Sequence, residues 1–235
     1  MRAVLYLSIL AASGVILPAQ AQRATSRSFP ASGFDRVALS GADDVIVTTG
    51  SGFSVRASGD PRAVEALEIV VERGALQVRR KQQGWNWGTG NRGKAVVRVT
   101  MPRIVGASLA GSGDMTIDRG EGNFNAAIAG SGDMAIGRID GRSVNLSVSG
   151  SGDLAAAGQA QQLQARIGGS GTIQAASLRA GAANVSVGGS GNLTARVSGD
   201  ARVSVAGSGS VDLGPGSRCR VSKAGSGSVR CGSQQ

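Results

Sequence analysis

Histidine is absent from the 235 residues, and aromatic residues make up only 3% of them. Without histidine the commonest acid–base catalyst and metal ligand is missing. We therefore predict no catalytic residue, no metal site and no cofactor. Cysteine occurs only twice, as Cys219 and Cys231. Long apolar runs are also lacking, except for one at the start of the chain.

That run covers residues 3–17, follows Arg2 and precedes Ala-Gln-Ala at 19–21. The pattern is typical of a secretory signal peptide, and its apolar part is too short to span a membrane. We predict that residues 1–21 are removed before Gln22. No cysteine follows closely, which argues against a lipid anchor. The mature chain is expected to be exported, periplasmic or extracellular at the cell surface, and to have no transmembrane segment.

Glycine is abundant, with 38 copies, and it recurs in a regular motif. A Gly-Ser-Gly tripeptide returns at intervals of 18–20 residues, a regularity typical of stacked repeats. The seven tripeptides start at Gly111, Gly130, Gly150, Gly169, Gly189, Gly207 and Gly225. Apolar residues stand two and four positions before each first glycine and four positions after it, except that Lys223 interrupts the last repeat. This period of two predicts strands on both sides of the tripeptide, with both glycines facing inward and the serine outward.

Such a coil cannot bury its apolar face alone, but coils stacked about 4.8 Å apart can. The sequence therefore predicts an all-β protein, a parallel β-helix (solenoid) with coils of 18–20 residues. Helices are disfavoured because each glycine costs about 1 kcal/mol relative to alanine. We expect a flexible lead-in over 22–33, a β-rich N-terminal part over 34–104 that continues or caps the solenoid, and the repeat β-helix over 105–235.

The N-terminal part contains its own local signals. Asp60 and Pro61 predict a helical turn over 62–67. Alternating apolar residues predict strands before and after it, with an exposed loop in the longest aperiodic stretch. The expected elements are strands around Val37, Val45 and Val55, a hairpin formed by 69–72 and 76–80, the loop over 81–94, and a strand over 95–101.

Together, several of these segments resemble a known family. They are Phe34–Ala42, the stretch from Val55 to Asp60, Leu76–Val78, Val99–Pro102 and Leu109–Asp114. Over roughly 34–213 the chain resembles the family "putative auto-transporter adhesin, head GIN domain". The resemblance implies a single-stranded, right-handed β-helix in an exported, surface-associated protein without catalytic residues to transfer.

Three aspartates follow consecutive tripeptides: Asp114, Asp133 and Asp153. Stacked carboxylates could bridge a calcium ion, or they could stabilise turns by accepting hydrogen bonds from the backbone. The serines of the tripeptides have no base at a fixed offset, which argues against nucleophilic catalysis. Asp114 with Asp118 offers only a weak candidate for a paired-carboxylate glycosidase site.

Charge is distributed unevenly along the chain. Without the signal peptide 24 basic and 15 acidic residues remain, and the segment 73–103 has eight basic residues and no acid. Basic charge favours anionic partners, although it could also simply keep the protein soluble. The candidate ligand-binding residues are Arg79, Arg80, Lys81, Trp85, Trp87, Arg92 and Lys94. The two tryptophans could stack on a sugar or a partner, or cover an end of the solenoid.

The sequence thus favours a non-enzymatic adhesin-like protein of the cell envelope that binds an anionic polysaccharide, lipopolysaccharide or an envelope protein. Export argues against nucleic acid. A purely structural protein that pairs with itself or a neighbour is the alternative, and a polysaccharide-processing enzyme is the third. Cys219 and Cys231 lie six residues on either side of Gly225. We expect them to form a disulfide in an oxidising compartment.

Overall fold

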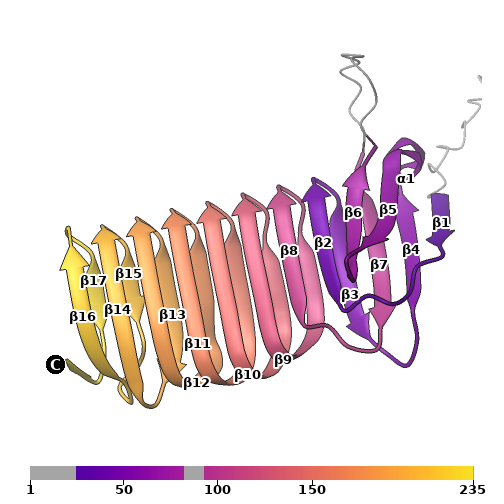
Figure 1. Ribbon diagram of the computed structural model, residues 1–235. Coiled ribbons are helices and arrows are strands. Elements are labelled where there is room, and N and C mark those ends of the chain that lie inside the picture. Colours follow the sequence, from indigo (N-terminus) through magenta and orange to yellow (C-terminus); the bar gives the residue numbers. More distant parts are fainter. Residues whose placement is uncertain (1–24, 82–92, 235) are drawn as a thin grey trace, which may run out of the picture.

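The computed structural model describes residues 25–81 and 93–234, and its chain forms a β-solenoid (Figure 1). The N-terminal part contains β1 (Thr25–Phe29), β2 (Arg36–Gly41), β3 (Asp44–Thr49), β4 (Ser54–Gly59), α1 (Pro61–Ala66), β5 (Leu67–Glu72), β6 (Ala75–Arg80) and β7 (Ala95–Met101). The repeats contain β8 (Gly106–Gly111), β9 (Met115–Gly130), β10 (Met134–Gly150), β11 (Asp153–Gly169), β12 (Thr172–Gly189), β13 (Asn192–Val197), β14 (Asp200–Gly207), β15 (Ser210–Asp212), β16 (Arg218–Ala224), β17 (Ser228–Arg230) and β18 (Ser233–Gln234).

Each coil contributes one strand segment to each of two walls, which meet at the Gly-Ser-Gly corner. Wall A holds the segments before the tripeptides, in the spatial order β5, β6, β2, β8, the second halves of β9–β12, β14, β16 and β18. Wall B holds the segments after them, in the order β1, β4, β7, β3, the first halves of β9–β12, β13, β15 and β17. Pairing within the repeats is parallel and keeps equivalent residues in register, as the repeat period predicted.

The apolar columns of the sequence form the interior. Leu109, Ile128, Val148, Ile167, Val187 and Val205 are all nearly inaccessible to solvent. They belong to a single apolar cluster that runs from the first coil to Cys219. At the last coil the interior opens, and Lys223, in register with Val205, is exposed. An ammonium at this position protects an edge that could otherwise pair with another chain.

The Gly-Ser-Gly corners form a ladder of their own. The carbonyl oxygen of Gly130 accepts hydrogen bonds from the N–H groups of Ser151 and Gly152 in the next coil, at 2.9 and 3.2 Å. The same pairing joins several other corners, for example from Gly150 to Ser170 and Gly171. The prediction that both glycines face inward is wrong for the first one, which is partly or fully exposed, whereas the second is buried. The first glycine is needed because its φ is positive, +121° at Gly150. A Cβ at Gly150 would also overlap the carbonyl oxygen of Gly130 in the preceding coil.

The coils do not stack in the order of the chain. The first coil, β2–β3, lies between the later coil β6–β7 and the first repeat, β8–β9 (Figure 1). After β3 the chain runs past this coil, folds β4 to β7 beyond it, and returns as β8. Residues 81–94 connect β6 of wall A with β7 of wall B, which is the place of a Gly-Ser-Gly corner in other coils.

The N-terminal end is covered by antiparallel strands. β5 pairs with β6 on wall A, and β4 with β7 on wall B. The expected lead-in is not loose throughout, because β1 pairs antiparallel with the free edge of β4. An edge strand offers a row of unpaired backbone groups, so a polar segment with weak local signals is ordered there. The predicted helical turn is α1, where Asp60 Oδ1 accepts the N–H groups of Arg62 and Ala63.

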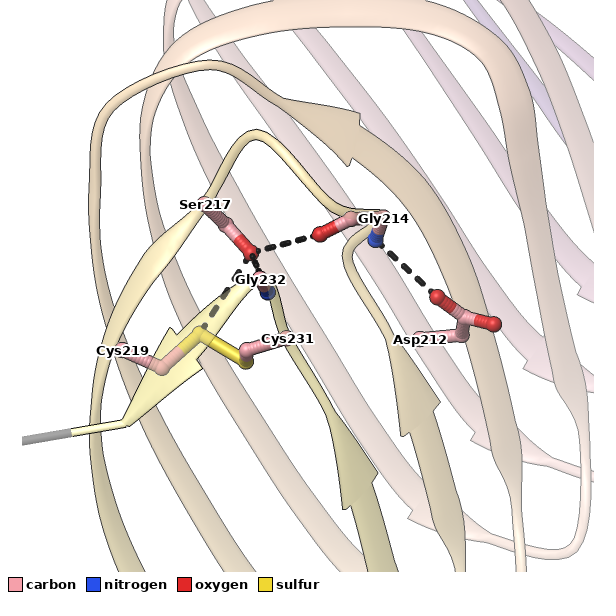
Figure 2. The surroundings of a disulfide bond; sticks show 6 residues. All are labelled: Asp212, Gly214, Ser217, Cys219, Cys231 and Gly232. Atoms are coloured by element: carbon pink, nitrogen blue, oxygen red, sulfur yellow. Dashed lines mark hydrogen bonds between the residues drawn. A yellow bond between two sulfur atoms is a disulfide. The ribbon is translucent and has the colours of Figure 1, made fainter.

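A disulfide between Cys219 and Cys231 closes the last coil, with a Cα–Cα distance of 6.3 Å, which confirms the predicted pair. Figure 2 shows buried Ser217 next to it, donating to the carbonyl oxygen of Gly214 at 2.9 Å. The N–H of Gly232 points at the Ser217 oxygen from 3.5 Å. The disulfide therefore holds the chain after β17 against β16, at the end of the solenoid where few strand pairings remain.

Replacing both cysteines by serine should lower the free energy of unfolding by about 3 kcal/mol, because the cross-link no longer restricts the unfolded chain. Thermal unfolding of the double variant, compared with the wild type with and without reductant, measures the effect. Reductant should bring the wild type to the level of the variant and leave the variant unchanged. Equal stability of all four samples would contradict the prediction.

Candidate binding surfaces

The basic segment 73–103 lies against acids from another part of the chain. Arg79 Nε is 2.9 Å from Glu68 Oε2, and its Nη2 is 3.4 Å from Glu72 Oε1. The hydrogen bond with Glu68 and the charges of both acids raise the pKa of Arg79. These contacts arise because β5, which carries both glutamates, pairs antiparallel with β6.

Arg80 is bound more deeply. Its Nε and Nη2 donate to the two carboxylate oxygens of Asp43 at 2.8 and 2.7 Å, and Nη2 also donates to the carbonyl oxygen of Gly93 at 3.0 Å. Asp43 is only 1% exposed and also accepts the N–H of Ala95 at 3.0 Å. The Asp43–Arg80 pair thus connects the corner of the first coil to both ends of the segment 81–94.

The remaining residues of the predicted site differ in their surroundings. Lys94 Nζ lies 3.2 Å from Asp44 Oδ1. Lys81 is exposed and, within the described residues, makes no ion pair. Trp85, Trp87 and Arg92 lie outside the described residues. Arg79, Arg80 and Lys94 therefore serve the packing of the N-terminal coils, and much of the charge expected in this segment is neutralised.

The aspartates after the tripeptides form a hydrogen-bonded ladder. Oδ1 of Asp114 accepts the N–H of Asp133, and Oδ1 of Asp133 accepts that of Asp153. The ladder continues to Asp44 on one side and Thr172 on the other. The carboxylates therefore bind backbone groups from coil to coil. Among the described residues, no group of three or more acids, cysteines or histidines is placed to hold a metal ion.

Asp118 is also engaged in structural contacts. Its Oδ2 accepts both the N–H and the hydroxyl of Thr49 at 2.9 Å, and its Oδ1 accepts the N–H of Arg119. Asp118 lies at the second corner of the solenoid, where each coil passes from wall B to wall A, and thus connects this corner to β3. The weak glycosidase candidate, Asp114 with Asp118, therefore consists of two carboxylates that each bind backbone groups.

A second basic surface lies on the outer face of wall A in the C-terminal coils. From residue 154 onward the sequence has eight basic residues and two acids. Arg166, Arg202 and Arg220 line a shallow groove of about 510 Å³, which we call the arginine groove. Arg202 and Arg220 are in register on β14 and β16, and Arg166 is in register with Ser186 of the serine row Ser186, Ser204 and Ser222.

The three arginines of the groove are exposed and, in the part of the chain that the structure describes, make no ion pair. The nearby carboxylate of Asp200 is bound to Arg218 at 2.9 Å. Two charges about 4.8 Å apart repel by about 0.9 kcal/mol in water. No acid among the described residues offsets this repulsion between Arg202 and Arg220. An anion from outside would offset it, so the groove attracts anions. Sequence reasoning missed it because the arginines are 18 or more residues apart; only the coil period could have indicated it.

A third basic cluster lies at the second corner of the solenoid. Arg138, Arg179 and Arg196 surround a polar hollow next to Gly158. Here Arg138 already forms a two-pronged ion pair with Asp140, at 2.7 and 3.2 Å, and Arg196 donates to the carbonyl oxygen of Ala176. This cluster is consequently less available to an outside anion than the arginine groove.

Fold and surface together define a class: a β-solenoid that presents charged, open faces. The chain belongs to the family described as "Putative auto-transporter adhesin, head GIN domain", which it matches over residues 33–214. This finding confirms the resemblance found in the sequence. Among curated proteins none matches the chain.

Solved structures support the fold. A putative adhesin from Bacteroides fragilis is similar with a TM-score of 0.76 and 21% identity, over 90% of this chain and 98% of the other. A putative lipid binding protein from Parabacteroides distasonis has a TM-score of 0.66 and 19% identity, over 88% and 96%. A putative adhesin from Parabacteroides merdae has a TM-score of 0.66 and 15% identity, over 88% and 95%. Within the described residues, no helix is long and apolar enough to cross a membrane.

Proposed function

We propose that this protein is an exported, non-enzymatic, adhesin-like protein that binds an anionic glycan or surface at the cell envelope. The observation that carries the proposal is the set of exposed guanidinium groups that make no ion pair among the described residues of the solenoid. The family is described as a putative auto-transporter adhesin and two solved structures of similar fold as putative adhesins, and these descriptions support the same function.

The interior also favours binding over catalysis. The buried polar side chains among the described residues are Asp43 and Ser217, and both have hydrogen-bond partners. Enzyme sites usually hold polar groups with perturbed protonation in a cleft. Here the buried carboxylate of Asp43 pairs with Arg80 and joins two coils rather than lining a cleft.

The test is retention of the wild type on immobilised polygalacturonate, heparin and lipopolysaccharide, with neutral dextran as the control. Retention on at least one anionic matrix should be strong at low ionic strength and fall steeply as salt rises, because exposed charges are screened beyond about 10 Å at 0.1 M. Equal retention on dextran, or none on any anionic matrix, would contradict the proposed function.

The segment 81–94 remains one candidate contact. Arg79, Arg80 and Lys94 already form ion pairs with acids of this chain. The candidate ligand-binding residues that remain in this region are therefore Lys81, Trp85, Trp87 and Arg92. The double variant Lys81→Glu/Arg92→Glu should weaken retention without changing thermal stability. Unchanged retention would exclude this segment as a contact.

A second candidate function is self-assembly, favoured by the C-terminal edge. β18 pairs with only Arg218 and Cys219 of β16. The rest of β16 has no strand on its outer side among the described residues. Exposed strand edges can pair with another chain, although the ammonium of Lys223 opposes pairing at its own position on this edge. Sedimentation velocity at increasing concentration separates the two functions, because a purely structural protein should associate without any glycan.

A further inference from the structure

The arginine groove has the features of a binding surface for an extended chain. It crosses four coils, from β11 through β12 and β14 to β16, which is about 14 Å at about 4.8 Å per coil. It is open rather than enclosed, and apart from the three arginines its lining consists of alanine, valine, serine and asparagine. A long polymer can therefore lie along the solenoid axis without any rearrangement of the protein.

Its surface combines charged groups with neutral hydrogen-bonding groups. One column holds Asn184, Arg202 and Arg220, and the neighbouring column holds Arg166 followed by the serine row. Guanidinium forks match planar carboxylates through two parallel hydrogen bonds. This chain already makes such bonds between Arg138 and Asp140. Hydroxyl and amide groups between the arginines suit the hydroxyls of sugars.

Other anionic polymers and surfaces fit less well. Binding to a membrane surface usually adds buried apolar side chains to the charge, but the exposed large hydrophobic residues within the described part are Phe53 and Val71, both in the N-terminal region. Single-stranded nucleic acid binds by stacking its bases on aromatic side chains, and the groove is lined by none.

We infer that the arginine groove binds a linear acidic polysaccharide, with its carboxylates on Arg166, Arg202 and Arg220 and its hydroxyls on the serine row. This inference rests on the proposed function and names the contact surface. The polymer would run across the coils, so that its charged sugars meet arginines of three different coils.

The test uses the triple variant Arg166→Ser/Arg202→Ser/Arg220→Ser and soluble polygalacturonate, with binding measured by calorimetry at low ionic strength. The matched control, Arg56→Ser/Arg62→Ser/Arg142→Ser, removes the same charge from exposed arginines outside the groove that also make no ion pair among the described residues. The groove variant should bind at least about tenfold more weakly, since it loses three ion pairs. The control should bind within about twofold of the wild type, because distant exposed charges are screened. Thermal unfolding of all three proteins checks that they are folded.

Each outcome is decisive. If both variants bind as tightly as the wild type, the arginine groove is not the binding site, but the proposed function remains intact. Equal weakening by both variants would mean that only net charge matters, which also excludes the groove as the binding site. If the wild type does not bind polygalacturonate but binds vesicles containing anionic phospholipid, the ligand is not an acidic polysaccharide and the inference is wrong. Failure of the wild type on every anionic matrix would instead overturn the proposed function itself.

Discussion

Gly150→Ala should lower the free energy of unfolding by more than about 3 kcal/mol, because it disturbs the corner ladder in the middle of the solenoid. At φ +121° an alanine is strained by about 1–3 kcal/mol. Its Cβ would also overlap the Gly130 carbonyl oxygen, which accepts the N–H groups of Ser151 and Gly152. Moving that carbonyl leaves donors unpaired, at a further cost of about 1–3 kcal/mol.

Gly168→Ala is the matched control, two positions before the next tripeptide's serine. Gly168 is exposed, its φ is not positive, and a Cβ there would meet no atom within 4 Å. Its replacement should change stability by less than about 1 kcal/mol. Guanidinium-induced unfolding of both variants measures the difference. If both substitutions lower the free energy of unfolding equally, then neither the positive φ nor the overlap of a Cβ with the carbonyl oxygen explains the corner glycines.

Asp43→Ala should cost about 3–5 kcal/mol, because it leaves the Arg80 guanidinium in a partly buried site without its partner. Asp43 accepts two hydrogen bonds from Arg80 and one from the Ala95 N–H, and it is 1% exposed. Loss of the carboxylate should therefore loosen the junction between the first coil and the segment 81–94. Hydrogen exchange of the amides in β6 and β7 should accelerate more than that of β11 and β12.

The control is Asp140→Ala, which breaks an ion pair of the same geometry on the surface. Arg138 donates to Asp140 at 2.7 and 3.2 Å, but both side chains are 40% or more exposed. Water solvates the groups left behind, so the cost should be below about 1 kcal/mol. Chemical denaturation of the two variants measures how much of the loss in stability comes from burial of the ion pair rather than from its hydrogen-bond geometry. Equal losses would show that the burial of Asp43 is not what makes its pair important.

Several features followed from local patterns alone. The parity of apolar residues around each tripeptide predicted the two walls, their register and the buried columns, because a strand alternates its side chains with a period of two. The spacing of Cys219 and Cys231 predicted the disulfide, and Asp60-Pro61 predicted α1. These features depend on residues close in sequence or separated by one repeat, so the sequence displays them directly.

The charge pattern along the chain was a poorer guide. The basic segment 73–103 meets Asp43, Asp44, Glu68 and Glu72, because the coil β6–β7 stacks beyond β2–β3 and beneath β5. A run of like charges along the chain predicts a patch only if nothing opposite folds against it. The arginine groove shows the converse, since arginines 18 or more residues apart come together when coils stack.

The sequence by itself determined the repeat, the strand period, the inward columns and the closing disulfide, because each is a local or periodic constraint on side-chain direction. Only the tertiary structure decided the order in which the first coils stack, the pairing of β1 with β4, the exposure of the first corner glycine and the distribution of free charge. These depend on which edges find partners when the chain doubles back between β3 and β8. No local signal encodes that choice, since every coil offers similar backbone edges and only long-range packing selects among them.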